Sequence, residues 1–399
     1  MIDVVECPGS RPARVGRKGS GMGERPDQAS PRRVWAKVGL VLILPIAATV
    51  WLVTNGWVDH ADRAKTADRT RDLATVVRAS GDLVEGLQNE RAAAALLISG
   101  EASARQRNYQ AAYTQAQSVV TAAVGGWAGP RGRLREVPTS ITTTLRQIDE
   151  GLAALPDLRS GVAGLKLSFT DEARAYTAVV DDLLALRDSA AQTADPALSE
   201  RMRAAAAVAR GKEHLSRERL VMLQAFSAGA MKPNLRTEFI AAQTGLAGAL
   251  ETFSATATGA EKALYDDTVA GTDLRTAVQF ASWVTGVMPA DGTLLGAPFT
   301  MDSWDSALRA NGALIRSVER QLDDTTVGAA NTARDNDRRE ALVEAGVPLA
   351  ILLLAIVLAA FVARSLTRSR RDLHDGAAVG GGPVDPDRPL ARTAASNRP

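Results

Sequence analysis

Residues 86–100 read GLQNERAAAALLISG, and their small and aliphatic side chains predict an amphipathic helix. Two adjacent charged residues, Glu90 and Arg91, interrupt the apolar face of this helix. Removing a charge from water is costly unless another group pairs with it. The pair therefore needs a partner elsewhere in the fold.

The same pattern occurs twice along the chain. The spacing E-x-L-x-x-E-R-x7-S runs from Glu85 to Ser99 and again from Glu213 to Ser227. Both copies lie on predicted helices with apolar flanking positions, and Arg219 takes the place of Arg91 in the second. This repetition predicts two similar helical halves in tandem.

The remainder of the segment between residues 58 and 341 is rich in Ala, Leu, Arg, Asp and Glu, with the 3.6-residue periodicity of helices. Helix breakers divide it into about eight helices with short connections. Asp195-Pro196 predicts a helix start, with Asp as the N-cap. The predicted breaks lie at Gly125-Gly126, Pro156, 232–234, Thr258-Gly259 and 288–298. The predicted fold class is all-α, with two tandem up-and-down four-helix bundles.

Two apolar runs, at residues 34–57 and 342–363, are each long enough to cross a bilayer as a helix. Lys and Arg precede the first run and follow the second, so the positive-inside rule predicts both termini in the cytoplasm. A cleaved signal peptide is the alternative for the first run, but its charged leader is long and favours an uncleaved anchor. The predicted location is the plasma membrane.

These runs divide the chain into five predicted parts. The two membrane spans flank an exterior sensor, residues 58–341, whose halves cover roughly 58–193 and 194–341. A basic, disordered N-terminus (1–33) and a short, mostly disordered basic tail (364–399) lie on the cytoplasmic side.

Composition argues against several classes of function. The formal net charge is only +2, which gives no reason to expect a nucleic-acid partner. One cysteine and three histidines, widely scattered, disfavour a metal site, and no cofactor is expected. No nucleophile, base and acid form a catalytic set, and His374 lies in a glycine-rich tail rather than in a helical phosphoacceptor domain. The chain is therefore not expected to be an enzyme.

The repeated arginines allow two interpretations. Neither Arg91 nor Arg219 has a carboxylate three or four residues away on its own helix, where a helical ion pair would form. Glu90, Glu218 or a carboxylate on a packing helix could pair with each arginine and fix the register of the bundle. Alternatively, the arginines could bind an anion.

The two copies resemble a known family. VEGLQNERAAAALLISG (84–100) and KEHLSRERLVMLQAFSAG (212–229) are similar to elements of the nitrate- and nitrite-sensing family of bacterial transmembrane receptors. The resemblance implies two four-helix bundles stacked end to end between transmembrane helices, with arginines that sense nitrate or nitrite. The chain departs from the usual pattern at Ala92, where a glycine commonly follows Glu-Arg.

This resemblance implies a ligand site for nitrate or nitrite. Nitrate is flat, and a guanidinium can grip two of its oxygens at once. Arg91 is the first candidate ligand, Arg219 the second and Lys212 the third, with Glu90 and Glu218 in supporting roles.

The expected function is that of a membrane receptor. ARSLTRSRRDLHDGA (363–377) resembles the opening of a HAMP linker, and the family usually continues into an output domain. We expect the ligand state to pass through the second span to a separate cytoplasmic output protein, such as a histidine kinase, in a homodimer. The alternatives are the sensory half of a histidine kinase and a ligand-free structural or protein-binding bundle.

Overall fold

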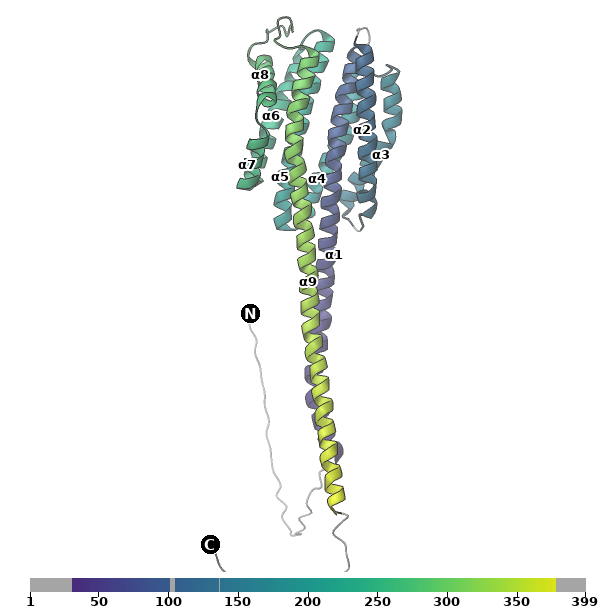
Figure 1. Cartoon of the computed structure of the whole chain (residues 1–399). Coiled ribbons are helices and arrows are strands. Elements are labelled where there is room, and N and C mark those ends of the chain that lie inside the picture. The colour runs from purple at the N-terminus through teal and green to yellow at the C-terminus, as the bar shows by residue number, and fades with distance from the viewer. Residues whose placement is uncertain (1–30, 101–104, 136, 378–399) are drawn as a thin grey trace, which may run out of the picture. The chain divides into compact units, whose positions relative to one another are not determined.

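A computed structural model describes the backbone of residues 31–100, 105–135 and 137–377, and this part of the chain contains nine helices and no strand (Figure 1). The side chains of residues 31–64 other than Trp51, and of several residues between 341 and 377, lie outside the description. The prediction of an all-α fold is confirmed for the described residues.

The helices fall into the two halves of the chain. The first half contains α1 (Pro31–Ser99), α2 (Gln106–Arg133), α3 (Thr139–Ala163) and α4 (Phe169–Thr193). The second half contains α5 (Pro196–Ala228), α6 (Pro233–Thr256), α7 (Gly259–Thr268), α8 (Thr272–Gly286) and α9 (Met301–Ala377). The predicted disordered N-terminus lies almost entirely outside the described residues, whereas α9 continues through residues 364–377 of the predicted tail.

Local side-chain chemistry fixes several helix starts. The Asp195 side chain accepts a hydrogen bond from the Ala197 backbone N–H at 3.0 Å, with Pro196 in the first turn, as the sequence predicts. Thr258 and Glu261 form a capping box at the start of α7. These contacts satisfy backbone donors that have no partner within the helix.

Two predicted breaks are absent from the structure, and one further break was not predicted. Helix α2 continues through Gly125-Gly126 to Arg133, and α3 continues through Pro156 to Ala163. The segment after Thr258 forms two short helices, which separate at Gly271, whose φ is +92°. Because a positive φ suits glycine, this break follows from residue chemistry that the helical periodicity does not show.

The chain divides into two compact units. One combines residues 1–54 with 348–399, and the other spans Asn55–Val347 and contains all the sites below. Among the described residues, no helix carries a stretch that is both apolar and long enough to span a bilayer. Most side chains of residues 34–57, and several of 342–363, lie outside the described part, so the two spans stay a prediction.

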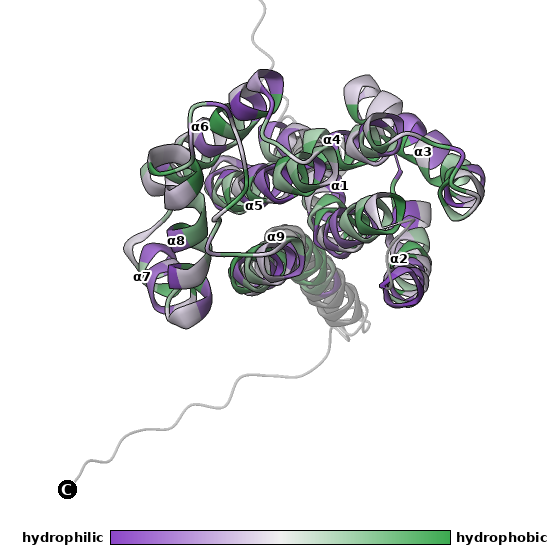
Figure 2. Cartoon of the chain, turned by 90° about the horizontal axis from the view of Figure 1, so that it is seen from above, coloured by the Kyte–Doolittle hydropathy of each residue, from purple (hydrophilic) through white to green (hydrophobic). Residues whose placement is uncertain are grey.

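Within the second unit, four helices lie in the middle. Viewed from above, α1, α4, α5 and α9 lie between α2 and α3 on one side and α6, α7 and α8 on the other (Figure 2). Buried ion pairs join α1 to α5 and α4 to α9. The two halves therefore lie side by side, and not end to end as the resemblance implies. This arrangement brings the two copies of the repeated motif face to face.

The apolar core includes an aromatic cluster in the second half. Trp304 is fully buried, and its ring centroid lies 5.2 Å from that of Phe299. The Trp304 indole N–H donates to the Arg219 carbonyl oxygen at 3.2 Å. The start of α9 is thus anchored to α5 next to the second repeated arginine.

Candidate functional site

The first repeated arginine, Arg91, is fully buried between α1 and α5. Its Nη1 and Nη2 donate to Oε1 and Oε2 of Glu213, each at 3.1 Å. The same two nitrogens donate to the hydroxyls of Thr177 at 2.6 Å and Ser216 at 2.8 Å. Burial raises the pKa of Glu213, but Arg91 and Arg217 outweigh this effect and hold it below its usual value. Both Nη atoms of Arg91 are therefore committed to protein partners.

The second repeated arginine, Arg219, is 5% exposed and points from α5 toward α9 and α1. Its Nε donates to Oδ1 of Asp305 on α9 at 2.7 Å. Its Nη1 donates to Oδ1 of Asn89 on α1 at 2.9 Å. A carboxylate on a packing helix thus accompanies each repeated arginine, which is the first of the two interpretations that the sequence allows.

Lys212 lies about two helical turns before Arg219 and is also buried, at 2% exposed. Its Nζ is 2.6 Å from Oε2 of Glu85 and 3.6 Å from Oε2 of Glu319. Burial raises the pKa of Glu85, but the charge and hydrogen bond of Lys212 outweigh this, so the pKa lies below its usual value. Glu85 is consequently ionised at neutral pH.

The two copies of the motif interlock. Glu213 of the second copy pairs with Arg91 of the first, whereas Glu85 of the first pairs with Lys212 beside the second. Asn89 completes the link, because it donates to Glu85 at 2.8 Å and accepts from Arg219. The two copies of the motif thus lie on two helices, α1 and α5, that face each other across one polar layer, which consists of these paired side chains.

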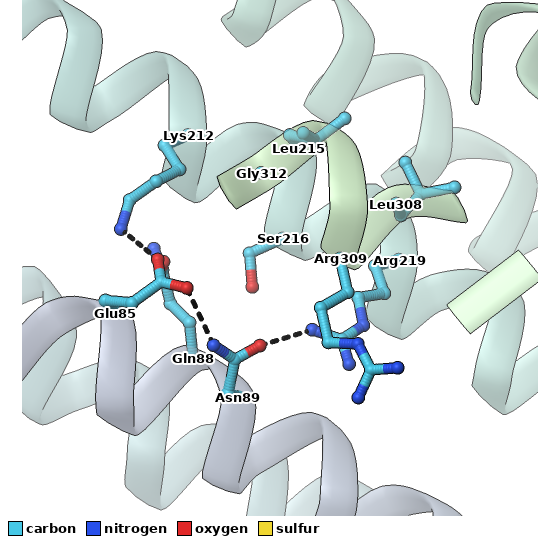
Figure 3. A pocket seen from close by; sticks show the side chains of 10 residues that line it. All are labelled: Glu85, Gln88, Asn89, Lys212, Leu215, Ser216, Arg219, Leu308, Arg309 and Gly312. Carbon is cyan, nitrogen blue, oxygen red and sulfur yellow. Dashed lines mark hydrogen bonds and ion pairs between the residues drawn. The ribbon is translucent and has the colours of Figure 1, made fainter. Parts of the chain in front are cut away.

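This polar layer borders a small pocket between α1, α5 and α9 (Figure 3). The pocket has a volume of about 20 Å³, which is enough for a single water molecule. Its lining includes three cationic side chains, Lys212, Arg219 and Arg309, and one carboxylate, Glu85. Ser216 Oγ lies at the centre of the view, between Lys212 and Arg219.

Arg309 is a pocket residue that the sequence analysis missed. It lies on α9, is exposed, and has no hydrogen-bond or ion-pair partner within the described part of the chain. Its guanidinium points to the same region as that of Arg219 in Figure 3. Neither copy of the motif contains it, and an exposed arginine on a helix breaks no apolar pattern. Only the packing of α9 against α1 and α5 brings it to the pocket.

The two predicted supporting glutamates do not line this cationic pocket. Glu90 is fully buried, and its two oxygens accept hydrogen bonds of 2.7 Å from Arg159 on α3. It also accepts one from the Tyr176 hydroxyl at 2.7 Å. Glu218 faces a different cavity between α5, α6, α8 and α9. The structure therefore brings Lys212 and Arg219 together with Arg309 at one pocket. Arg91 does not line this pocket and contacts it only through its hydrogen bond to Ser216.

The geometry suits recognition of a small anion. The Ser216 hydroxyl oxygen accepts from Arg91, which leaves its hydrogen free to donate into the pocket. Arg309 adds an uncommitted fork of donors at the mouth. Lys212 and Arg219 are each paired with carboxylates, so Arg309 supplies the uncompensated positive charge that favours an anion here.

The family model described as nitrate and nitrite sensing matches residues 82–327, which is more than half of the chain. The chain belongs to the nitrate- and nitrite-sensing family. The matched region contains Glu85, Lys212, Arg219 and Arg309, and so includes the whole cationic pocket.

One solved structure extends this result. The structure of the NasR transcription antiterminator has a TM-score of 0.62 to this chain at 19% sequence identity, and the match covers 73% of this chain and 82% of that chain. This likeness establishes a shared fold. No curated protein sequence matches the chain.

Proposed function

We propose that the cationic pocket binds nitrate or nitrite and that the chain is a membrane-anchored receptor for this ligand. The observation that carries the proposal is the meeting of Lys212, Arg219 and the uncommitted Arg309 at one pocket. This meeting occurs inside the region that the family model matches.

The donors available match a planar monovalent anion. Arg309 can grip two nitrate oxygens with its fork, and the Ser216 hydroxyl can donate to the third. Lys212 and Arg219 add positive charge from α5, although both already have carboxylate partners. Of the sequence candidates, Arg91 acts through Ser216, whose hydroxyl it orients.

Ligand binding must move a wall of the pocket. Space for a single water molecule does not hold the three oxygens of nitrate. The wall formed by α9 contributes Leu308, Arg309 and Gly312, of which Arg309 is the least constrained. We infer that the ligand selects a state in which α9 is displaced relative to α1 and α5.

The proposed route of signal transmission is the long helix α9. This helix is continuous from Met301 to Ala377, so it joins the pocket to the apolar run at 342–363. We propose that this run and residues 34–57 are membrane spans, with both termini cytoplasmic. The displacement of α9 would then reach a separate cytoplasmic output protein, such as a histidine kinase, within a homodimer.

Thermal melts of the full chain in detergent test the ligand. We expect sodium nitrate or nitrite to raise the melting temperature saturably, and sodium chloride at the same ionic strength to do so much less. Arg309→Gln should weaken the nitrate effect about tenfold or more, because one charge-assisted contact contributes about 1.5–3 kcal/mol. Arg201→Gln is the matched control, since Arg201 is an exposed arginine of α5 that does not line the pocket.

Two results would contradict the proposed ligand. A wild-type melt that does not move with either anion favours the ligand-free bundle. Equal losses for Arg309→Gln and Arg201→Gln would show a general charge effect rather than a site.

Reporter fusions test the membrane topology separately. A reporter after Arg371 should be active only in the cytoplasm, and one inserted near Gly292 only outside. The opposite pattern would place the sensor in the cytosol and remove the proposed direction of signalling.

A further inference from the structure

A second cavity lies within the second half of the chain, between α5, α6, α8 and α9. Its volume of about 360 Å³ falls in the range of small-molecule pockets in proteins. Its walls are mainly apolar and include Leu246, Leu250, Leu274 and Ala281. Leu215 and Leu308 separate it from the cationic pocket, because they line both.

Two polar residues on this cavity lack partners. Glu218 is 2% exposed and Asn311 is 5% exposed, and both line the cavity. Within the described part of the chain, Glu218 Oε1 and Asn311 Oδ1 have no hydrogen-bond partner. Leaving a buried acceptor unsatisfied costs about 1–3 kcal/mol, so such atoms call for an explanation.

The contrast with Glu90 shows that Glu218 is not a second structural ion pair. Glu90 occupies the same position in the first copy of the motif and binds Arg159 with both oxygens. No arginine or lysine lines the cavity around Glu218. The second copy of the motif therefore places a buried carboxyl at a cavity that no cationic side chain lines.

We propose that this cavity binds a small organic cation that carries a primary ammonium group on an apolar body. Asn311 Oδ1 is a hydrogen-bond acceptor, and so is Glu218 Oε1 once its carboxyl is ionised, so a ligand that pairs with both must supply donors. An ammonium has three donors and a charge opposite to that of a carboxylate. The leucine and alanine walls suit an aromatic or alkyl body, whereas nitrate would meet no cationic side chain there.

Binding has a proton balance that can be measured. Burial raises the pKa of Glu218 to about 8, so the empty site holds a neutral carboxylic acid at pH 7. An ammonium ion arrives with its own proton and favours the carboxylate. The Glu218 proton is therefore released to solvent, and binding should tighten as the pH rises from 7 toward 9.

Calorimetric titration of the full chain in detergent tests this proposal. We expect 2-phenylethylammonium chloride to bind saturably and at least tenfold more tightly than 2-phenylethanol. Titrations at pH 7 in two buffers of different ionisation enthalpy should show release of up to one proton. Glu218→Gln should weaken binding at least tenfold and abolish the proton release. Glu251→Gln, on an exposed glutamate of α6 that does not line the cavity, should change neither result.

A second variant keeps the test decisive if Glu218→Gln does not fold. Ala281→Phe fills the cavity from its half-buried rim and should remove binding without touching the carboxyl. The proposal is overturned if neither 2-phenylethylammonium nor hexylammonium binds, or if the alcohol binds as tightly as the ammonium. It is also overturned if folded Glu218→Gln protein binds like the wild type. All titrations are made without nitrate, so their outcome is independent of the ligand of the cationic pocket.

Discussion

Arg91 on α1 and Glu213 on α5 are joined by two hydrogen bonds of 3.1 Å, and both side chains are almost completely buried. They belong to different copies of the same sequence motif, 122 positions apart. Their pairing makes each copy the partner of the other. The charge that interrupts the apolar face of the first helix is thus explained by the second helix.

The Arg91–Glu213 pair should show strong coupling. Arg91→Met alone leaves the Glu213 carboxylate with only Arg217 and Gln88, and should lower the free energy of unfolding by about 3 kcal/mol. Combining it with Glu213→Leu should recover most of this loss, because two apolar groups then replace two charges. Chemical denaturation of the wild type, both single variants and the double variant measures the coupling.

The exposed pair Arg146 and Glu150 on α3 serves as the control. Both side chains are mostly in water, so the same double-mutant cycle should give a coupling below about 1 kcal/mol. Equal coupling for the two pairs would show that burial does not strengthen the Arg91–Glu213 interaction.

The buried carboxyl of Glu172 should make the free energy of unfolding depend on pH. This residue is fully buried near Arg91 and Glu90, and neither of its oxygens has a hydrogen-bond partner in the described part of the chain. Burial raises its pKa well above the usual value, Arg91 opposes the rise, and Glu90 adds to it. The folded state therefore keeps a proton that the unfolded state releases, so this group stabilises the fold at low pH and loses that effect as the pH rises.

Glu172→Gln imitates the protonated form and should remove this pH dependence. Its stability advantage over the wild type should grow as the pH rises above about 4.3, the usual carboxyl pKa. Urea denaturation between pH 4 and pH 8 measures the difference, with the exposed Glu238→Gln as control. Parallel stability curves for the wild type and Glu172→Gln would mean that Glu172 ionises normally.

Gly292 should tolerate no side chain. Its φ is +74°, and a Cβ placed there would lie 2.1 Å from the Met231 carbonyl oxygen. The Gly292 carbonyl also accepts the Met231 N–H at 2.8 Å, which ties the loop before α9 to the turn before α6. Gly296 has a similar φ of +84° but open space around it.

Gly292→Ala should therefore cost at least about 2 kcal/mol more than Gly296→Ala, which carries only the backbone strain of about 1–2 kcal/mol. Thermal or urea unfolding of the two variants gives the comparison. Similar stabilities would show that the contact with Met231 relaxes without loss.

Helix starts could be predicted where local chemistry decides them, as at Asp195-Pro196. The continuation of α2 through a pair of glycines could not. Gly125-Gly126 has low helical propensity, but Val120 and Trp127 are buried on either side of it, so packing carries α2 through the weak point. Tertiary contacts outweigh a local preference of about 1 kcal/mol per glycine.

The candidate site divides in the same way. Arg91 and Arg219 could be found because each interrupts an apolar stripe and has no carboxylate three or four residues away on its own helix. Their partners Glu213 and Asp305 lie on other helices, and spacing along one helix does not show which faces meet. Arg309 could not be found, because an exposed arginine is ordinary until packing places it at a pocket.

Arg219 allows a test in which two substitutions have opposite effects on nitrate binding. Its guanidinium is held by Asp305 through Nε and by Asn89 through Nη1, so an anion in the pocket competes with these groups. Arg219→Lys keeps the charge but removes the fork, and should weaken nitrate binding about tenfold. Asp305→Asn keeps the shape but removes the competing charge, and should tighten nitrate binding.

Asp267→Asn, on an exposed residue of α7, controls for the change in net charge. Nitrate titrations followed by calorimetry measure all three. If Asp267→Asn tightens nitrate binding as much as Asp305→Asn does, the effect comes only from the change in net charge. If Asp305→Asn weakens nitrate binding, Asp305 orients Arg219 for the ligand instead of competing with the ligand.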